Sequence, residues 1–465
     1  MSSSKPTEAA ARVAFVTLGC PKNQVDSEEM MGRLAAAGYA LAALPEAADI
    51  VVVNTCAFVR AAQRESIETV LALAPGSARL VVAGCLAERH GAELMREIPE
   101  IAGLLGPGRT GEVAGVVGAV LAGEHPIELG GFAAVDLSAE RVRTGAPHTA
   151  YVKIAEGCDH HCRFCLIPRL RGPLRSRSSA SIRAELARLG DEGAREAVLV
   201  AQDTTAYGRD LAGHPGLPAL LRELRDAPGP PWIRLLYTHP ARWTDALMRV
   251  FAEGGRLLPY IDVPIQHCAD PVLQAMGRGR AGARIRRLVE RLRARIPRAV
   301  LRTTVMTGHP GEGVAEFDEL LRFLGEFPFD RLGVFAYSPE AETCGASLPR
   351  VARREALHRR AEVLRRQREL VLPLQRRRVG ETLEVLTEAW DARRHRLLGR
   401  SYGEAPEIDG WVRIRLPRAA DGAEIELGEL RPVRIVGAGA YDLDAVFADA
   451  VRPPSGNGQA RGHIS

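Results

Sequence analysis

The sequence predicts a mixed α/β protein of three domains: an N-terminal parallel-sheet α/β domain, a central (β/α)6 partial barrel, and a small OB-like C-terminal β-barrel. Apolar runs alternate with helical stretches over residues 12–124, and the same alternation returns six times over 148–376. Over residues 379–447 it gives way to short alternating runs separated by turn residues. Strands that alternate with helices form parallel sheets, whereas short strands joined by turns form barrels or sandwiches.

The N-terminal segment repeats one pattern three times. Three apolar runs each end just before a cysteine, and the pairs are Val13–Thr17 with Cys20, Ile50–Val53 with Cys56, and Leu80–Ala83 with Cys85. The stretches between and after them are typical of helices: Ser27–Ala37, Arg60–Leu73 and Ala87–Arg96. Because parallel strands end at one edge of a sheet, we expect the three thiols to meet there. The alternative is three small core cysteines, and their position after the strands argues against it.

A linker and six further strands are expected next. Residues 125–147 are rich in proline and glycine and lack a clean period, which predicts the linker. The strand candidates are Ala150–Ile154, Ala197–Ala201, Ile233–Tyr237, Tyr260–Val263, Val300–Met306 and Leu332–Tyr337. The helical stretches between them include Ser181–Glu192, Pro218–Arg225, Ala283–Arg295 and Val314–Glu326. Several strands end in polar groups, among them Gln202-Asp203 and Thr307-Gly308-His309, at the edge that carries the chemistry of β/α barrels.

The C-terminal third begins with an arginine-rich stretch, Arg350–Arg378, that predicts a long helix. We expect its arginines to form a solvated face with acidic partners (Glu355, Glu362 and Glu369), and contact with RNA or the ribosome is the alternative. Five short strands are expected to close the final barrel: Thr382–Leu386, Arg396–Arg400, Trp411–Leu416, Ala423–Leu427 and Val433–Val436. Residues 448–465 are expected to be disordered.

Composition and charge bound the class of protein. The chain has 465 residues, 46% apolar and 26% charged, which is ordinary for a soluble globular protein. Its longest weakly polar run, Val113–Gly123, is too short to span a bilayer, and the N-terminus lacks the apolar core of a signal peptide, so we expect no membrane partner and a cytoplasmic protein. The net charge of +5 is uneven, because residues 379–447 hold 9 Arg against 13 Asp and Glu, a net of −4.

Three of the eight cysteines form a C-x3-C-x2-C run, Cys158, Cys162 and Cys165, directly after the first barrel strand. Closely spaced thiolates select zinc or iron–sulfur clusters. A structural zinc normally takes four protein ligands, whereas three cysteines on a [4Fe–4S] cluster leave one iron open to a small molecule. His160 or His161 could complete a zinc site instead, although neighbours in so tight a loop point apart and no second cysteine pair lies nearby.

Together these motifs resemble the radical S-adenosylmethionine (radical SAM) methylthiotransferase family. The C-x3-C-x2-C run resembles the radical SAM superfamily, while Leu18–Glu28, Asn54-Thr55-Cys56 and Gly84-Cys85-Leu86 resemble the family's N-terminal domain and the final barrel resembles its TRAM domain. The match covers about residues 12–447. Within the family, three motifs are similar to those of the branch that modifies a ribosomal protein (RimO type). They are Cys20-Pro21-Lys22-Asn23, Gln202–Gly208 and Ala405–Gly410. One departure is His309, where the family commonly has Phe.

The resemblance implies two [4Fe–4S] clusters and S-adenosylmethionine as cofactors. Cys158, Cys162 and Cys165 would bind the cluster whose open iron holds S-adenosylmethionine, and Cys20, Cys56 and Cys85 a second cluster that carries the sulfur. Gln202, Asp203, Gly308 and Gly311 are expected near S-adenosylmethionine. The implied substrate is an aspartate of small-subunit ribosomal protein twelve, converted at its β-carbon to β-methylthioaspartate. An electron donor and a sulfur donor are implied as further partners.

Two alternatives remain at this stage. The first is the same chemistry on an adenosine of tRNA (MiaB type), which the acidic residues 379–447 disfavour because phosphate contact needs basic groups. The second is a non-catalytic metal-binding scaffold for RNA. Cys268 and Cys344 fall outside both triplets and are expected to be unliganded, although Cys268 follows a predicted strand end.

Overall fold

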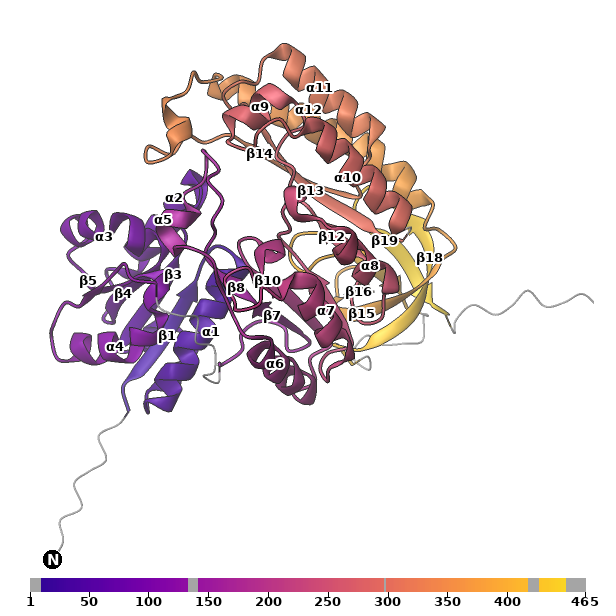
Figure 1. The fold of residues 1–465 in the computed structure, drawn as a ribbon. Coiled ribbons are helices and arrows are strands. Elements are labelled where there is room, and N and C mark those ends of the chain that lie inside the picture. The colour runs from indigo at the N-terminus through magenta and orange to yellow at the C-terminus, as the bar shows by residue number, and fades with distance from the viewer. Residues whose placement is uncertain (1–9, 133–140, 297, 417–425, 449–465) are drawn as a thin grey trace, which may run out of the picture. The chain divides into compact units, whose positions relative to one another are not determined.

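The computed structural model describes residues 10–132, 141–296, 298–416 and 426–448 (Figure 1). They form two compact units. The first runs to Phe327 and includes Leu332–Leu364, and the second consists of Pro328–Arg331 with the residues from Arg365 onward. None of the helices described is long and apolar enough to cross a membrane.

The first domain is a six-stranded parallel sheet. Its strands, in spatial order, are β2 (Ala40–Ala42), β1 (Arg12–Thr17), β3 (Ile50–Thr55), β4 (Arg79–Gly84), β5 (Ile101–Leu105) and β6 (Ile127–Glu128). Its helices are α1 (Pro21–Ala36), α2 (Arg60–Leu73), α3 (Cys85–Glu97) and α4 (Val113–Leu121). The prediction of a parallel α/β domain is confirmed. Strands β2, β5 and β6 were not predicted, and β6 lies in the range predicted as linker.

Burial explains why this sheet forms. Strand β3 is buried along its whole length and β4 from its second residue, as expected for parallel strands covered on both faces. One hydrophobic cluster holds Met30 of α1 and Val117 of α4, and a second cluster holds Val70 of α2 and Leu94 of α3. Helices therefore cover both faces, and the carboxyl ends of the strands are left free to carry functional groups.

The central domain contains six strands in two adjoining parallel sets. They are β7 (Thr149–Lys153), β10 (Glu196–Val200) and β11 (Trp232–Leu235), then β12 (Tyr260–Asp262), β13 (Val300–Thr307) and β14 (Arg331–Ala336). A single parallel bridge, Ile233 to Leu257, connects the described residues of β11 to the segment before β12. All six predicted strands are present. They form two three-stranded sets and not one closed ring, which is the arrangement of a partial barrel.

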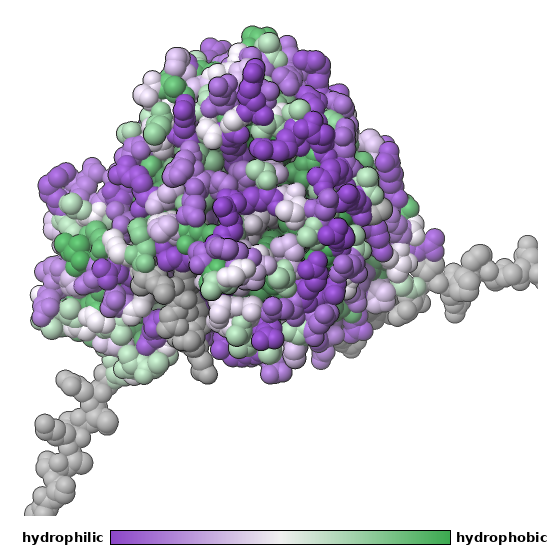
Figure 2. All heavy atoms as spheres, in the orientation of Figure 1, coloured by the Kyte–Doolittle hydropathy of each residue, from purple (hydrophilic) through white to green (hydrophobic). Residues whose placement is uncertain are grey.

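Eight helices and a short hairpin accompany these strands. The helices are α5 (Ile167–Arg171), α6 (Ser179–Asp191), α7 (Gly216–Asp226), α8 (Asp245–Glu253), α9 (Asp270–Ala275), α10 (Gly282–Arg295), α11 (Val314–Glu326) and α12 (Arg353–Arg376). Strands β8 (Ala155–Glu156) and β9 (Arg175–Ser176) pair antiparallel and bracket the C-x3-C-x2-C segment. In α12 the expected acidic partners are present: Glu355 pairs with Arg359 at 2.7 Å, and Glu369 pairs with Arg365 at 2.5 Å. Figure 2 shows hydrophilic side chains over most of the face in view, with hydrophobic ones scattered among them.

The C-terminal domain is a closed five-stranded barrel. Its strands, in spatial order, are β15 (Thr382–Asp391), β16 (Arg396–Arg400), β17 (Val412–Arg415), β19 (Leu443–Phe447) and β18 (Leu430–Ala438). The barrel was predicted, but the strand expected over Ala423–Leu427 is wrong: Leu427 lies in a turn, and residues 423–425 lie outside the described residues. The fifth strand is β19, which was hard to recognise because Asp444 interrupts its short apolar run and aspartate is rare in strands. Asp444 is accommodated by ion pairs to Arg396 and Arg413. The tail expected to be disordered lies outside the described residues beyond Ala448.

Candidate active site

The structure brings the first cysteine triplet together at the carboxyl edge of the N-terminal sheet. Cys20 caps the N-terminus of α1, Cys56 follows the last residue of β3, and Cys85 is the first residue of α3. Burial raises the pKa of Cys56 to about 11, and the nearby Cys20 and Cys85 thiols contribute in the same direction. Three thiols are therefore close enough to interact, and two lie at helix N-termini that favour negative charge.

Two glycines make this convergence possible. Gly19 has φ +96°, and a Cβ placed there would lie 2.6 Å from the Cβ of Cys56. Gly84 has φ +88°, and its Cβ would lie 2.4 Å from the Asn54 side-chain oxygen and 2.6 Å from the Thr55 carbonyl oxygen. Both positions combine a left-handed backbone with close approach, so glycine is the residue that fits.

Buried amides hold the loops of this triplet in place. The Asn23 side chain donates to the Leu18 carbonyl at 2.9 Å and to the Thr55 carbonyl at 3.0 Å, which ties the segments before Cys20 and Cys56 to each other. Asn54 donates to the Asn23 carbonyl at 2.8 Å. The Cys56 amide donates to the Ser66 hydroxyl at 3.0 Å. The Asn-Thr-Cys and Cys-Pro-Lys-Asn motifs are thus parts of one hydrogen-bonded assembly.

The second triplet lies in the loop between β8 and α5. Gly157 has φ +81°, and a Cβ there would lie 1.9 Å from the Pro173 carbonyl oxygen, so the chain passes this point only with glycine. The Cys158 amide donates to the Gly172 carbonyl at 3.0 Å, which closes the loop. Burial raises the pKa of Cys158 to about 11 and that of Cys165 to about 12, and each is raised further by Cys162. These three thiols also form one group.

Gln202 and Asp203 follow β10 and face this loop. Asp203 accepts a hydrogen bond from the His160 ring at 2.7 Å and pairs with Arg242 at 3.1 Å. Burial acts to raise the pKa of Asp203, but the hydrogen bonds from His160 and Thr205 outweigh it and hold that pKa below its ordinary value. Gln202 donates to Glu156, while its own side-chain oxygen is buried without a partner among the described residues.

A pocket of about 330 Å³ opens beside the second triplet. Its lining includes Cys162, His160, Arg242, Arg278 and Arg284. His239 also lines it and stacks on His160 with ring centroids 4.0 Å apart. The pocket is thus a polar cavity with arginines around a cysteine, which suits a ligand that carries a carboxylate.

The Gly308–Glu312 loop follows β13 and packs on the cysteine loop through an aromatic contact. The His309 ring is fully buried and meets Phe164, which lies between Cys162 and Cys165, edge to face at 6.1 Å. Burial lowers the pKa of His309 to about 4, so the ring is neutral and fills the place of an aromatic side chain. A Cβ at Gly308 would lie 2.2 Å from the Cβ of Ala356, whereas one at Gly311 would meet the Pro271 carbonyl oxygen at 3.3 Å.

The two remaining cysteines belong to neither triplet. Cys268 is fully buried, and burial raises its pKa to about 12; the charged groups that affect it are Glu319, Arg286 and Arg322. Cys344 is exposed in the short 3-10 helix η5 (Cys344–Ser347), next to Gly345, whose amide donates to the Arg163 carbonyl of the second triplet's loop at 2.7 Å.

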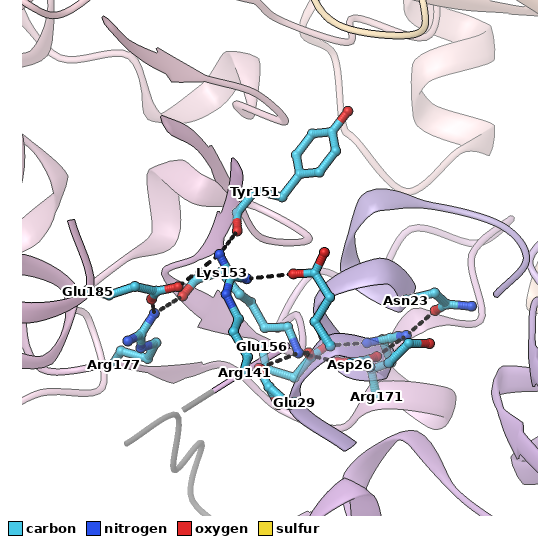
Figure 3. A network of polar contacts seen from close by, with 12 residues as sticks. Asn23, Asp26, Glu29, Arg141, Tyr151, Lys153, Glu156, Arg171, Arg177 and Glu185 are labelled. Atoms are coloured by element: carbon cyan, nitrogen blue, oxygen red, sulfur yellow. Dashed lines mark hydrogen bonds and ion pairs between the residues drawn. The ribbon is translucent and has the colours of Figure 1, made fainter. Parts of the chain in front are cut away.

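A buried polar network that the sequence analysis did not identify (Figure 3) links Asn23, near the first triplet, to Glu156, near the second. Lys153 of β7 pairs with Asp26 of α1 and with Glu156 at 2.9 Å. Arg171, the last residue of α5, pairs with Asp26 and Glu156 at 3.0 Å each and donates to the Asn23 side chain at 2.5 Å. The only available sequence signal was the presence of charged residues inside otherwise apolar segments.

Each donor set consists of three cysteines, whose thiolates are the usual ligands of iron–sulfur clusters. Within the described parts of the chain, no three His, Cys, Asp or Glu side chains are placed to share one ion. A [4Fe–4S] cluster binds each cysteine through a separate iron. His160, considered as a fourth zinc ligand, is bonded to Asp203, and His161 is exposed.

Comparison with known proteins agrees with this geometry. Residues 12–106 match the uncharacterized protein family UPF0004, residues 152–324 the radical SAM superfamily, and residues 379–447 the TRAM domain. The ribosomal protein uS12 methylthiotransferase RimO of Pelotomaculum thermopropionicum is 45% identical over 93% of this chain and 98% of its own length. The RimO of Desulforudis audaxviator is also 45% identical, over 94% and 97%. The chain belongs to the RimO methylthiotransferase family.

Solved structures support the fold. The radical S-adenosylmethionine methyltransferase TsrM from Kitasatospora setae, with cobalamin and a [4Fe–4S] cluster bound, has a TM-score of 0.54 at 15% identity and covers 72% of this chain and 77% of its own. As a member of the RimO family, the chain is a radical SAM methylthiotransferase, a type of enzyme that uses S-adenosylmethionine and [4Fe–4S] clusters. The interpretation as a non-catalytic scaffold is therefore set aside, and the tRNA alternative gains no support from these relatives.

Proposed function

We propose that this enzyme methylthiolates the β-carbon of an aspartate in ribosomal protein uS12. The observation that carries the proposal is the 45% identity to a uS12 methylthiotransferase over nearly the whole of both chains. Both cysteine triplets lie inside the matched ranges, which supports the same chemistry at the same positions.

In this proposal each triplet holds one [4Fe–4S] cluster. Cys158, Cys162 and Cys165 bind the cluster that engages S-adenosylmethionine, and Cys20, Cys56 and Cys85 bind the second, auxiliary cluster. When bound, the cofactors supply the radical that removes a hydrogen atom from the substrate carbon, and also the sulfur and the methyl group. The protein supplies binding, orientation and the exclusion of water.

Four further residues are proposed to shape the S-adenosylmethionine site. The unpartnered oxygen of Gln202 is an acceptor for a hydroxyl or amine of the cofactor. The Oδ2 of Asp203 accepts from His160 and Arg242 and its Oδ1 accepts from Thr205, so its part is to orient the first two side chains toward the pocket. Gly308 and Gly311 allow their loop to approach its neighbours closely, and His309 packs that loop on Phe164.

The charge distribution supports a protein substrate. Residues 379–447 carry a net charge of −4, which complements a basic ribosomal protein and opposes the phosphates of tRNA. The arginines that line the pocket suit the carboxylate of an aspartate. An electron donor and a sulfur donor complete the proposed set of partners, and the ribosomal substrate implies that the enzyme works in the cytoplasm.

Mass spectrometry of a deletion strain tests the proposed substrate. The uS12 protein should lose the mass of one methylthio group, while the methylthio-adenosine of tRNA stays at its wild-type level. Loss of the tRNA modification with an unchanged uS12 mass would overturn the proposal in favour of the tRNA enzyme.

Anaerobic reconstitution tests the two clusters. The wild-type chain should take up about eight irons, and replacing all three cysteines of either triplet with alanine should leave about four. Production of 5′-deoxyadenosine after reduction should require the second triplet, Cys158, Cys162 and Cys165. Cys344→Ser, at an exposed cysteine outside both triplets, is the matched control and should keep the full iron content.

A further inference from the structure

Helix α5 connects the two cysteine triplets through only six residues of chain. It begins two residues after Cys165, the last cysteine of the second triplet, and ends at Arg171, whose guanidinium contacts the first triplet's loops. Leu166 and Leu170 are buried in the same hydrophobic cluster as Cys85 and Leu86. This short helix belongs to the central domain in sequence and to the core of the N-terminal domain in packing.

Arg171 is buried and bonded on the side that faces the first triplet. It is 2% exposed, and its two terminal nitrogens donate to Glu156, Asp26 and Asn23. Asn23, which accepts from Arg171, donates in turn to the carbonyls of Leu18 and Thr55, beside Cys20 and Cys56. One buried cation of the central domain is thus bonded to the loops that carry the cysteines of the N-terminal domain.

The neighbouring charges leave this cation balanced. Asp26 and Glu156 each pair with both Arg171 and Lys153, so two carboxylates are shared between two cations. The group as a whole is close to neutral. Loss of the arginine alone would turn the buried surface beside the first triplet into a negative one, and low dielectric makes such a change strong.

We propose that Arg171 is a positioning residue that sets the redox potential of the cluster bound by Cys20, Cys56 and Cys85. The inference rests on the proposed function, because it requires a cluster at that triplet. One-electron reduction adds a negative charge to the cluster, and a cation buried beside the cluster stabilises the reduced form. Arg171 therefore keeps this cluster easier to reduce than its burial alone would allow, while α5 fixes its position relative to the second triplet.

The test is a potentiometric titration, followed by electron paramagnetic resonance, of single-cluster proteins. The background is the full chain with Cys158, Cys162 and Cys165 replaced by alanine, so only the first triplet binds iron. Arg171→Gln removes the cation and keeps a polar side chain at this position. Arg171→Lys keeps the cation, and Arg169→Gln, on the exposed side of the same helix, is the matched control.

We expect Arg171→Gln to lower the ratio of reduced to oxidised cluster at a fixed potential by at least tenfold, equivalent to 59 mV for one electron. Arg171→Lys should recover most of that loss, and Arg169→Gln should show none. In the reciprocal background, with the first triplet removed, Arg171→Gln should leave the remaining cluster's potential unchanged. An unchanged first-triplet potential, or equal shifts of both clusters, would overturn the inference.

Iron content keeps the two proposals distinguishable. A wild-type chain that takes up only about four irons, with Cys20→Ala unchanged, would refute the auxiliary cluster and therefore the proposed function. If the chain takes up about eight irons but the redox potential of the first-triplet cluster does not change when Arg171 is replaced, only the inference is refuted.

Discussion

Replacing Gly84 with alanine should destabilise the N-terminal domain and empty the first triplet. Its φ of +88° and ψ of −158° lie in a region almost restricted to glycine, which costs another residue about 1–3 kcal/mol. The added Cβ would lie 2.4 Å from an Asn54 oxygen and 2.6 Å from the Thr55 backbone oxygen, and crowding of this kind costs about 1–3 kcal/mol more. A gain of about 0.4–1 kcal/mol from the less flexible unfolded chain offsets part of this. The expected loss of folding free energy is about 2–5 kcal/mol.

Gly38→Ala is the matched control. Gly38 has a similar φ of +89° in the same domain, but nothing lies within 4 Å of the added Cβ, so we expect a loss of about 1 kcal/mol. Hydrogen exchange of peptides over β3 and β4 is the suitable assay, because all four tryptophans lie at position 232 or beyond and fluorescence would not report this domain. Iron uptake should fall to about half in Gly84→Ala alone. Equal protection and equal iron in the two variants would refute the close-approach argument.

Three further outcomes are expected. Burial raises the pKa of Glu29 to about 7, so its carboxyl stays protonated in the folded state at pH values where the unfolded chain has released the proton. The free energy of unfolding should therefore fall as pH rises from about 4.5 to 7. Glu29→Gln should remove that pH dependence in urea titrations of the apo protein. Arg234→Met leaves Glu196 without its 2.6 Å ion pair in a fully buried site and should cost about 3–5 kcal/mol, whereas Arg225→Met, in a part-exposed pair, should change thermal unfolding much less. His309→Phe should keep the iron content and change stability by less than about 1.5 kcal/mol, since the ring is neutral and its Nε2 has no partner among the described residues; a large loss in calorimetry would show that its Nδ1 bond to Pro310 matters more than packing.

The sequence predicted the architecture where apolar periodicity was strong. Strands such as β3 and β4 are long apolar runs, so their existence and parallel pairing followed from pattern alone. It missed β19, in which Asp444 is tolerated through ion pairs to Arg396 of β16 and Arg413 of β17, and it missed β6, a two-residue edge strand with almost no pattern. In both, tertiary contacts decide the structure and local composition does not.

The candidate site was likewise predicted in part: residues with a local sequence signal were identified, and those placed by tertiary contacts were not. The six triplet cysteines were identified because their spacing and their place after strands carry the signal. Arg171 was not, because an arginine in a short helix next to other arginines is indistinguishable by sequence from the exposed Arg169 two residues before it. Its partners Asp26 and Glu156 lie 145 and 15 residues away along the chain, so only the folded structure brings the charges together.

The packing of α5 also limits how independent the two halves of the first unit can be. The N-terminal sheet has the order and crossovers of a complete domain, but its hydrophobic cluster includes Leu166 and Leu170 from the following domain. A fragment ending near residue 124 would expose the surface that these leucines cover. Insertion of one residue between Cys165 and Arg171 would rotate the arginine by about 100° around the helix and point it away from the first triplet. Length variation is therefore much less tolerable in these six residues than in a surface loop.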